Sequence, residues 1–176
     1  MRVMMKDTIA VIVDYQEKLV PVMNEATAVI KNTMILLEGL KILEVPMLVT
    51  QQYTKGLGNT IERIQNILEF VPIEKISFSA YDEIQEQIKG KKFVIVCGIE
   101  AHICVLQTVI DLVEAGYQPV LVADCISSRK ELDKQYAIKR AEEEGAIITT
   151  YEAILFELLQ KAGSEKSKQI QKLIKL

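Results

Sequence analysis

The sequence predicts a three-layer α/β/α protein, in which helices cover both faces of a doubly wound, mainly parallel sheet of five to six strands. Short apolar runs rich in Val and Ile recur along the chain, as is typical of parallel strands buried on both faces. Segments with helical spacing of apolar residues lie between these runs. The 176 residues, 49% of them apolar, suffice for one sizeable core, so we predict a single domain over residues 1–176.

The strands and helices are expected in strict alternation. The apolar runs predict strands at residues 8–14, 46–50, 92–98, 118–124 and 145–150. Helical spacing predicts helices at residues 24–44, 59–69, 82–89, 101–115, 131–144 and 151–163. Gly90, Gly116 and Gly145 close three of these helices, where glycine is favoured.

A helical tail is predicted at about residues 164–176, where Ile170, Leu173 and Ile174 stand at helical spacing among many lysines. This tail could pack on its own domain, pack on another subunit, or fray.

The composition argues against several classes of partner. The formal net charge is −3, and the 21 basic and 24 acidic residues are spread along the chain, so no basic stripe is expected to bind nucleic acid. The apolar runs are far shorter than the ~20 residues that cross a bilayer, and the first ten residues resemble neither a signal nor a transit peptide. Three cysteines without C-x-x-C spacing fit a reducing compartment. We therefore expect a soluble cytoplasmic protein without a nucleic-acid or membrane partner.

Polar residues at the carboxyl ends of the predicted strands are the first candidates for a site, because parallel sheets bind ligands there. Asp14, Gln51, Gln52 and Asp124 occupy such positions. From the residue alone, Asp14 is equally a cap on the sheet end or a site residue.

Cys104 lies in the first turn of the helix expected from Ala101, where unpaired N–H groups and the helix dipole lower the pKa of a thiol. Cys97 and Cys125 lack such a position and are expected to be small buried apolar residues. The helix is expected to have an apolar face and a more polar one, formed respectively by Ile103, Leu106, Ile110 and Val113 and by Cys104, Thr108 and Asp111.

The single histidine, His102, is not expected to activate Cys104. Helical residues two positions apart point about 200° away from each other, so His102 belongs to the rim of the site or to the solvent. Lys75, within an apolar segment, is either a surface lysine or a cation held against a carboxylate.

Six segments, taken together and in order, resemble the isochorismatase-like cysteine hydrolases, a family that includes nicotinamidases and N-carbamoylsarcosine amidase. Within that family they look closest to a small branch of isochorismatase-domain proteins whose natural substrates are mostly unassigned. The segments are "VIVDYQEKL" (11–19), "VTQQYTKGLGNT" (49–60), "EKISFSA" (74–80), "VCGIEAHICVLQT" (96–108), "VADCISSR" (122–129) and "GAIITTYEAILFEL" (145–158).

The resemblance implies a catalytic triad of Asp14, Lys75 and Cys104. Cys104 would attack a carbonyl and form a thioester, Asp14 would act as general base and acid, and Lys75 would hold both by charge. It also implies a cis peptide bond between Ile99 and Glu100, and an oxyanion hole made by the backbone N–H groups of Glu100 and Cys104.

The sequence also departs from parts of this family. The nicotinamidases bind a metal through Asp and His after the second strand, whereas "TQQYTKGLGNT" contains neither residue, so we expect no metal and no cofactor. True isochorismatases lack the nucleophilic cysteine, so Cys104 argues against their vinyl-ether chemistry. Gln16, Gln51, Gln52 and Tyr53 are candidates to line the substrate pocket, although polar residues after a strand are often simply solvated. Phe78 is a candidate for an apolar wall of the pocket and could equally belong to the core.

These features predict a metal-independent cysteine hydrolase that cleaves a C–N bond of a small molecule. Homo-oligomers are usual in the family, and the apolar tail residues Leu173 and Ile174 are compatible with that. A catalytically silent binding protein is the alternative, although such a scaffold would need none of the triad residues. A nuclease is a weaker third possibility, disfavoured by the absence of a basic stripe.

Overall fold

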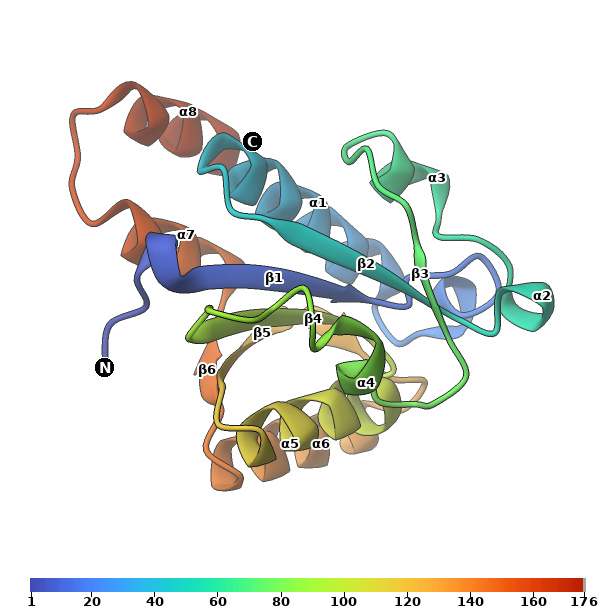
Figure 1. Ribbon diagram of the computed structural model, residues 1–176. Coiled ribbons are helices and arrows are strands. Elements are labelled where there is room, and N and C mark those ends of the chain that lie inside the picture. The colour runs from blue at the N-terminus through green and yellow to red at the C-terminus, as the bar shows by residue number, and fades with distance from the viewer. Residues whose placement is uncertain (176) are drawn as a thin grey trace.

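The computed structural model describes residues 1–175, which form a six-stranded sheet with all neighbouring strands parallel (Figure 1). The strand order is β3-β2-β1-β4-β5-β6, so the chain winds outwards in both directions from β1 and β4. The predicted doubly wound α/β fold is confirmed. The strands are β1 (Thr8–Val13), β2 (Met47–Gln52), β3 (Ile73–Lys75), β4 (Phe93–Ile99), β5 (Gln118–Ser127) and β6 (Ile147–Thr149).

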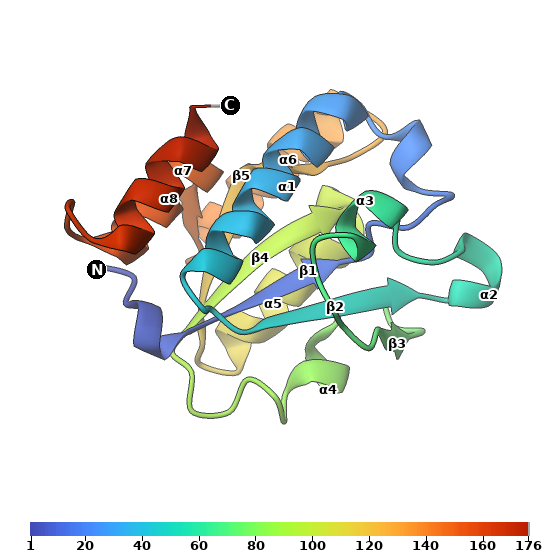
Figure 2. The ribbon, with the colours of Figure 1, turned by 90° about the horizontal axis from the view of Figure 1, so that it is seen from above.

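Helices cover both faces of the sheet, as Figure 1 shows from the side and Figure 2 from above. One apolar core lies between the sheet and α1, α3, α7 and α8, and the other between the sheet and α4, α5 and α6. The helices are α1 (Ala26–Ile42), α2 (Thr54–Leu57), α3 (Glu62–Gln65), α4 (Tyr81–Ile84), α5 (Leu106–Glu114), α6 (Glu131–Glu143), α7 (Tyr151–Leu159) and α8 (Glu165–Ile174), with 3-10 turns at Met5–Asp7 and Val20–Val22 and a π-helical turn at Ala101–Val105.

Two predicted helices are shorter in the structure, and one strand was not predicted. The helices expected over 59–69 and 82–89 shrink to α3 and α4, four residues each, because single turns with one buried residue apiece gain little from packing. β3 was not expected as a strand, since its three residues include Glu74 and Lys75 and form no apolar run.

The tail forms α8, which packs on α1 and α7 of its own domain with Ile170 fully buried. Leu173 and Ile174 are half-buried, so they are not the exposed apolar pair that the sequence suggested, while Leu176 lies outside the described residues. No helix in residues 1–175 combines the length and the apolar character needed to cross a membrane.

Candidate active site

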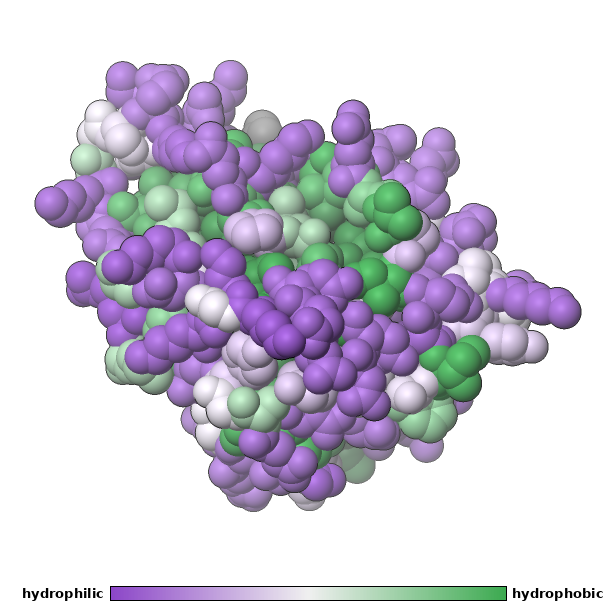
Figure 3. Space-filling view, viewed as in Figure 1, coloured by the Kyte–Doolittle hydropathy of each residue, from purple (hydrophilic) through white to green (hydrophobic). Residues whose placement is uncertain are grey.

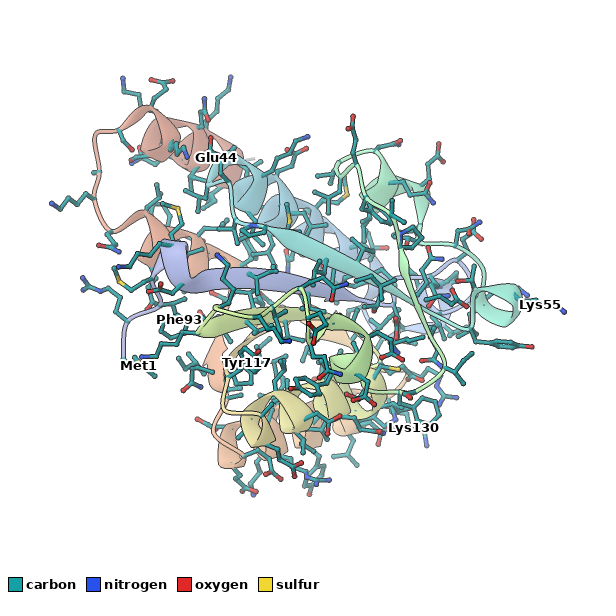
Figure 4. The ribbon with its side chains drawn as sticks, in the orientation of Figure 1. Met1, Glu44, Lys55, Phe93, Tyr117 and Lys130 are labelled. Atoms are coloured by element: carbon teal, nitrogen blue, oxygen red, sulfur yellow. The ribbon has the colours of Figure 1, made fainter. Side chains whose placement is uncertain are left out.

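The carboxyl ends of the strands converge at one end of the molecule. Figure 4 labels Lys55 and Lys130 at this end, and Phe93 and Tyr117 at the opposite end, where β4 and β5 begin. Asp14 directly follows β1, Lys75 is the last residue of β3, and Cys104 lies in the π-helical turn that follows β4. The topology therefore brings three residues from distant parts of the sequence to one edge of the sheet.

Asp14 and Lys75 form a fully buried ion pair. Asp14 Oδ2 lies 2.7 Å from Lys75 Nζ, and both side chains are 0% exposed. Asp14 adopts a left-handed backbone conformation, with φ of 55°, which Asp tolerates better than most residues. Its Oδ1 accepts a hydrogen bond of 2.7 Å from Thr50, the residue opposite Val13 in the register of β1 and β2.

The two carboxylate oxygens of Asp14 differ in their hydrogen bonding. Although Lys75 Nζ is near, Oδ2 has no hydrogen bond of normal geometry to any residue in the part of the chain that the structure describes. Burial raises the pKa of Asp14, and the charge of Lys75 opposes this effect. A buried carboxylate with a raised pKa, whose Oδ2 is paired only with the ammonium group of Lys75 by charge, is suited to accept a proton.

Lys75 Nζ is surrounded by oxygen atoms. Besides the contact with Asp14, it donates to Gln52 Oε1 at 2.6 Å, to Ser77 O at 3.2 Å and to Phe78 O at 2.8 Å. The ammonium group is thus satisfied without water, as a buried cation must be. The alternative of a surface lysine is wrong for this residue.

Cys104 is buried, with 6% of its surface exposed. Burial, with the negative charge of Asp14 as the next cause, raises the pKa of the thiol to about 12, while Lys75 acts in the opposite direction. The lowered pKa that was predicted for Cys104 is therefore wrong for the free site, because loss of solvation and the charge of Asp14 outweigh the effect of Lys75. At pH 7 the thiol is therefore almost entirely protonated, so attack requires a base that takes the proton.

The helix after β4 presents a different face to the core than the sequence suggested. Ile103, Ile110 and Val113 are only half-buried, whereas Cys104 and Thr108 are buried. The chain enters α5 through the π-helical turn rather than through a regular α-helical turn, and this changes the direction in which Cys104 points. Cys104, which was expected on the more polar face of the helix, therefore faces the carboxyl end of the sheet.

The segment between β4 and the π-helical turn contains the cis peptide bond Ile99–Glu100. The Glu100 carboxylate is held by Arg129, whose backbone N and Nε each lie 3.1 Å from its oxygens. Immediately before, Gly98 has φ of 148°, and a Cβ atom there would lie 2.3 Å from Val13 O. Only glycine allows β1 and β4 to approach this closely beside Asp14. The oxyanion hole of Glu100 and Cys104 N–H groups remains a prediction.

His102 is directed to other partners than Cys104. Its Nδ1 lies 2.8 Å from Ser128 Oγ and its Nε2 lies 3.9 Å from Asp133 Oδ2. These contacts join the π-helical turn to the residue after β5 and to α6, so His102 is engaged by structural neighbours and not by Cys104.

The amides of Gln16 and Gln51 are used by the protein itself. Gln16 Nε2 donates to the carbonyl oxygens of Gln52 and Gly58, and its Oε1 accepts from Gln52 N. Gln51 Oε1 accepts two hydrogen bonds from Thr60, and its Nε2 donates to a neighbouring hydroxyl. Both side chains thus bind the protein's own loops, and their place in the substrate pocket remains a prediction.

Of the other pocket candidates, Gln52 holds Lys75, while Tyr53 and Phe78 are 51% and 54% exposed. Tyr53 follows β2 and Phe78 follows β3, and Figure 3 shows hydrophobic surface over the segment after β3. Both rings are therefore half exposed, so the alternative that Phe78 is a core residue is wrong, and a place for the two rings in the substrate pocket remains a prediction.

No group of three or more His, Cys, Asp or Glu side chains within residues 1–175 is arranged to hold a metal ion. Ionisable groups around Cys104 are Asp14 and Lys75, which act on its thiol through charge and hydrogen bonding. Such an arrangement supplies a nucleophile, a proton carrier and a compensating cation from the chain itself.

Two contributing residues were missed from the sequence. Thr50 orients Asp14, and Thr108 accepts a hydrogen bond of 2.9 Å from Ala80 N while donating one of 2.7 Å to Cys104 O. The signal for Thr50 was a polar residue at the end of an apolar run, level with the end of β1. Thr108 was expected on the more polar face of its helix, and nothing in the sequence indicated that this position is buried.

Comparisons with known proteins agree with this fold. Residues 8–153 match the family model described as "Isochorismatase domain". The chain is 37% identical over 177 residues to isochorismatase domain-containing protein 2 of Danio rerio, covering 98% of this chain and 89% of the relative. It is 34% identical over 183 residues to the secreted isochorismatase effector Isc1 of Phytophthora sojae, covering 99% and 87% respectively.

A solved structure, described as that of the MAR1 ribonuclease of Caenorhabditis elegans, superposes with a TM-score of 0.95 at 37% identity, covering 100% of this chain and 93% of the other. Because one relative is named a secreted protein, a cytoplasmic location stays a prediction.

Proposed function

The chain belongs to the isochorismatase family, and on this basis we propose that it is a metal-independent cysteine hydrolase that cleaves the C–N bond of a small amide. The observation that carries the proposal is the buried Asp14–Lys75 pair beside the Cys104 thiol. A scaffold without chemistry would have no need to bury an ion pair, which is costly to desolvate, next to a cysteine.

In the proposed mechanism, Asp14 Oδ2 accepts the thiol proton as Cys104 Sγ attacks the amide carbonyl carbon. The negative charge on the carbonyl oxygen is stabilised by the N–H groups of Glu100 and Cys104. Asp14 then gives the proton to the leaving amine, and the C–N bond breaks to leave a thioester. Asp14 next takes a proton from water as the water oxygen attacks the thioester, the C–S bond breaks to release the carboxylic acid, and Asp14 returns the proton to the Cys104 thiolate.

Lys75 has a compensating role in this mechanism. Its ammonium group stays within reach of both Asp14 and Cys104, so the negative charge can move between carboxylate and thiolate without leaving an uncompensated buried charge. The exposed rings of Tyr53 and Phe78 would contact the part of the substrate that remains outside the buried centre.

The proposal is tested by measuring ammonia or amine release from a panel of small amides. We expect the wild-type protein to turn over at least one amide, to keep this activity after treatment with a chelator, and to lose it in Cys104→Ala. Cys97→Ala is the matched control, because Cys97 is also a buried thiol but lies on the other face of the sheet. Equal activity in wild type and Cys104→Ala would refute the covalent mechanism.

A ribonuclease is the second candidate, because the similar structure from C. elegans carries that name. The formal net charge of −3 does not favour binding to a phosphate backbone. RNA cleavage that disappears in Cys104→Ala would support this candidate, whereas equal cleavage by both proteins would indicate contamination.

A further inference from the structure

Thr108 makes two buried hydrogen bonds between the catalytic elements. It lies on α5, one helical turn after Cys104, and is fully buried. Its Oγ1 donates to the backbone O of Cys104 at 2.7 Å and accepts from the backbone N of Ala80 at 2.9 Å. Thr108 therefore joins the backbone that carries the nucleophile to the start of α4.

Ala80 ends the short segment that follows Lys75. At the near end of this segment, Lys75 Nζ donates to the backbone oxygens of Ser77 and Phe78. At the far end, Ala80 N donates to Thr108. One segment of the chain is thus attached at one end to the ammonium group and at the other, through Thr108, to Cys104.

We propose that Thr108 is a positioning residue that fixes Cys104 relative to Lys75 through Ala80. This inference rests on the proposed role of Cys104 as the nucleophile. Loss of the Thr108 hydroxyl leaves the Ala80 N–H buried without an acceptor, so the segment shifts. The ammonium group that this segment surrounds is then held less well against the thiolate, and small displacements of reacting groups have large effects on rate.

Thr33 on α1 provides a matched control. It is also fully buried, and its Oγ1 donates to Val29 O, four residues earlier, at 2.8 Å. Its second partner is the hydroxyl of Tyr15, at 3.0 Å. Thr33 therefore has the same local bond and the same burial as Thr108, but lies in the core on the opposite face of the sheet.

The experiment measures the rate at which iodoacetamide alkylates Cys104, as a function of pH, by peptide mass spectrometry. The proteins are wild type, Thr108→Val, Thr108→Ser and Thr33→Val. We expect Thr108→Val to react about tenfold more slowly than wild type at each pH from 7 to 9, where the folded protein can be assayed. Thr108→Ser, which keeps the hydroxyl, and Thr33→Val should both follow the wild-type profile.

A wild-type profile in Thr108→Val would overturn the inference, as would an equal slowing in Thr108→Val and Thr33→Val. If Thr108→Val does not fold, Thr108→Ala removes the same hydroxyl with less bulk and takes its place. The alkylation profiles decide the role of Thr108 whether or not amide turnover is found, so failure of the proposed function is recognised separately by the ammonia assay.

Discussion

Cys97 and Cys104 lie on opposite faces of the same sheet, and their surroundings differ more than their acidity. Each is buried, and burial raises the pKa of each thiol to about 12. On the α1 side, the polar groups near Cys97 are neutral: the Tyr15 hydroxyl contacts Thr33 and the backbone O of Cys125. On the other side, Cys104 has a carboxylate and an ammonium group beside it. The resting pKa of a thiol does not identify a nucleophile, whereas a neighbouring proton acceptor does.

The two faces also differ in how completely their polar atoms are paired. The hydroxyls of Tyr15 and Thr33 have hydrogen-bond partners, while Asp14 Oδ2 has none of normal geometry among residues 1–175. The neutral cluster contributes to stability, whereas the charged pair contains the proton acceptor that the proposed mechanism requires.

The largest expected difference between the two sites comes from removing Asp14, the proposed proton acceptor beside Cys104. Asp14→Asn should slow acylation of Cys104 by p-nitrophenyl acetate by about 10²–10⁴-fold, the usual contribution of a general base. The rate is measured from the release of p-nitrophenol in the first turnover. Cys97→Ala should acylate at the wild-type rate, and an undiminished rate in Asp14→Asn would remove Asp14 from the mechanism.

Removal of the cation should have the next largest effect, on stability. Lys75→Met leaves Asp14 as an uncompensated buried charge and should lower the free energy of unfolding in urea by about 3–5 kcal/mol. On the neutral face, Tyr15→Phe removes only a hydroxyl and should cost about 1 kcal/mol. The double variant Asp14→Asn/Lys75→Met should regain most of the loss, and an additive loss would show that the two charges do not stabilise each other.

The smallest expected effect concerns pH. Because the pKa of Asp14 is raised in the folded state, its contribution to stability is fully present below its ordinary value of 3.8 and is lost as pH rises through the folded pKa. The difference in unfolding free energy between wild type and Asp14→Asn should therefore fall with rising pH, by at most about 1.4 kcal/mol per unit. Urea titrations at several pH values measure this difference, and a rise instead would mean that Lys75 dominates over burial.

The sheet could be predicted because runs such as "TIAVIV" are buried on both faces and carry their apolar signal in the sequence itself. β3 could not, since its pairing with β2 depends on register and not on composition. Asp14 and Lys75 came together only through the family resemblance, because Asp14 alone fitted a sheet-end cap equally well and Lys75 alone fitted a surface residue better.

Two features of the site depend on three-dimensional packing alone. The effect of the helix N-terminus on Cys104 was predicted from local sequence, but the loss of solvation that outweighs it comes from distant segments. Gln52 was expected at the pocket, and only the fold shows that its amide oxygen is occupied by Lys75.

Gly98 limits how this site can be remodelled. An engineer who wants to admit bulkier substrates can vary Tyr53 and Phe78, whose exposed rings can change size without displacing a strand. Any side chain at Gly98 would instead collide with the Val13 backbone and move Asp14 away from Cys104. A mutant library that leaves Gly98 unchanged and varies the two aromatic residues would therefore retain far more folded and reactive members than one that varies all three.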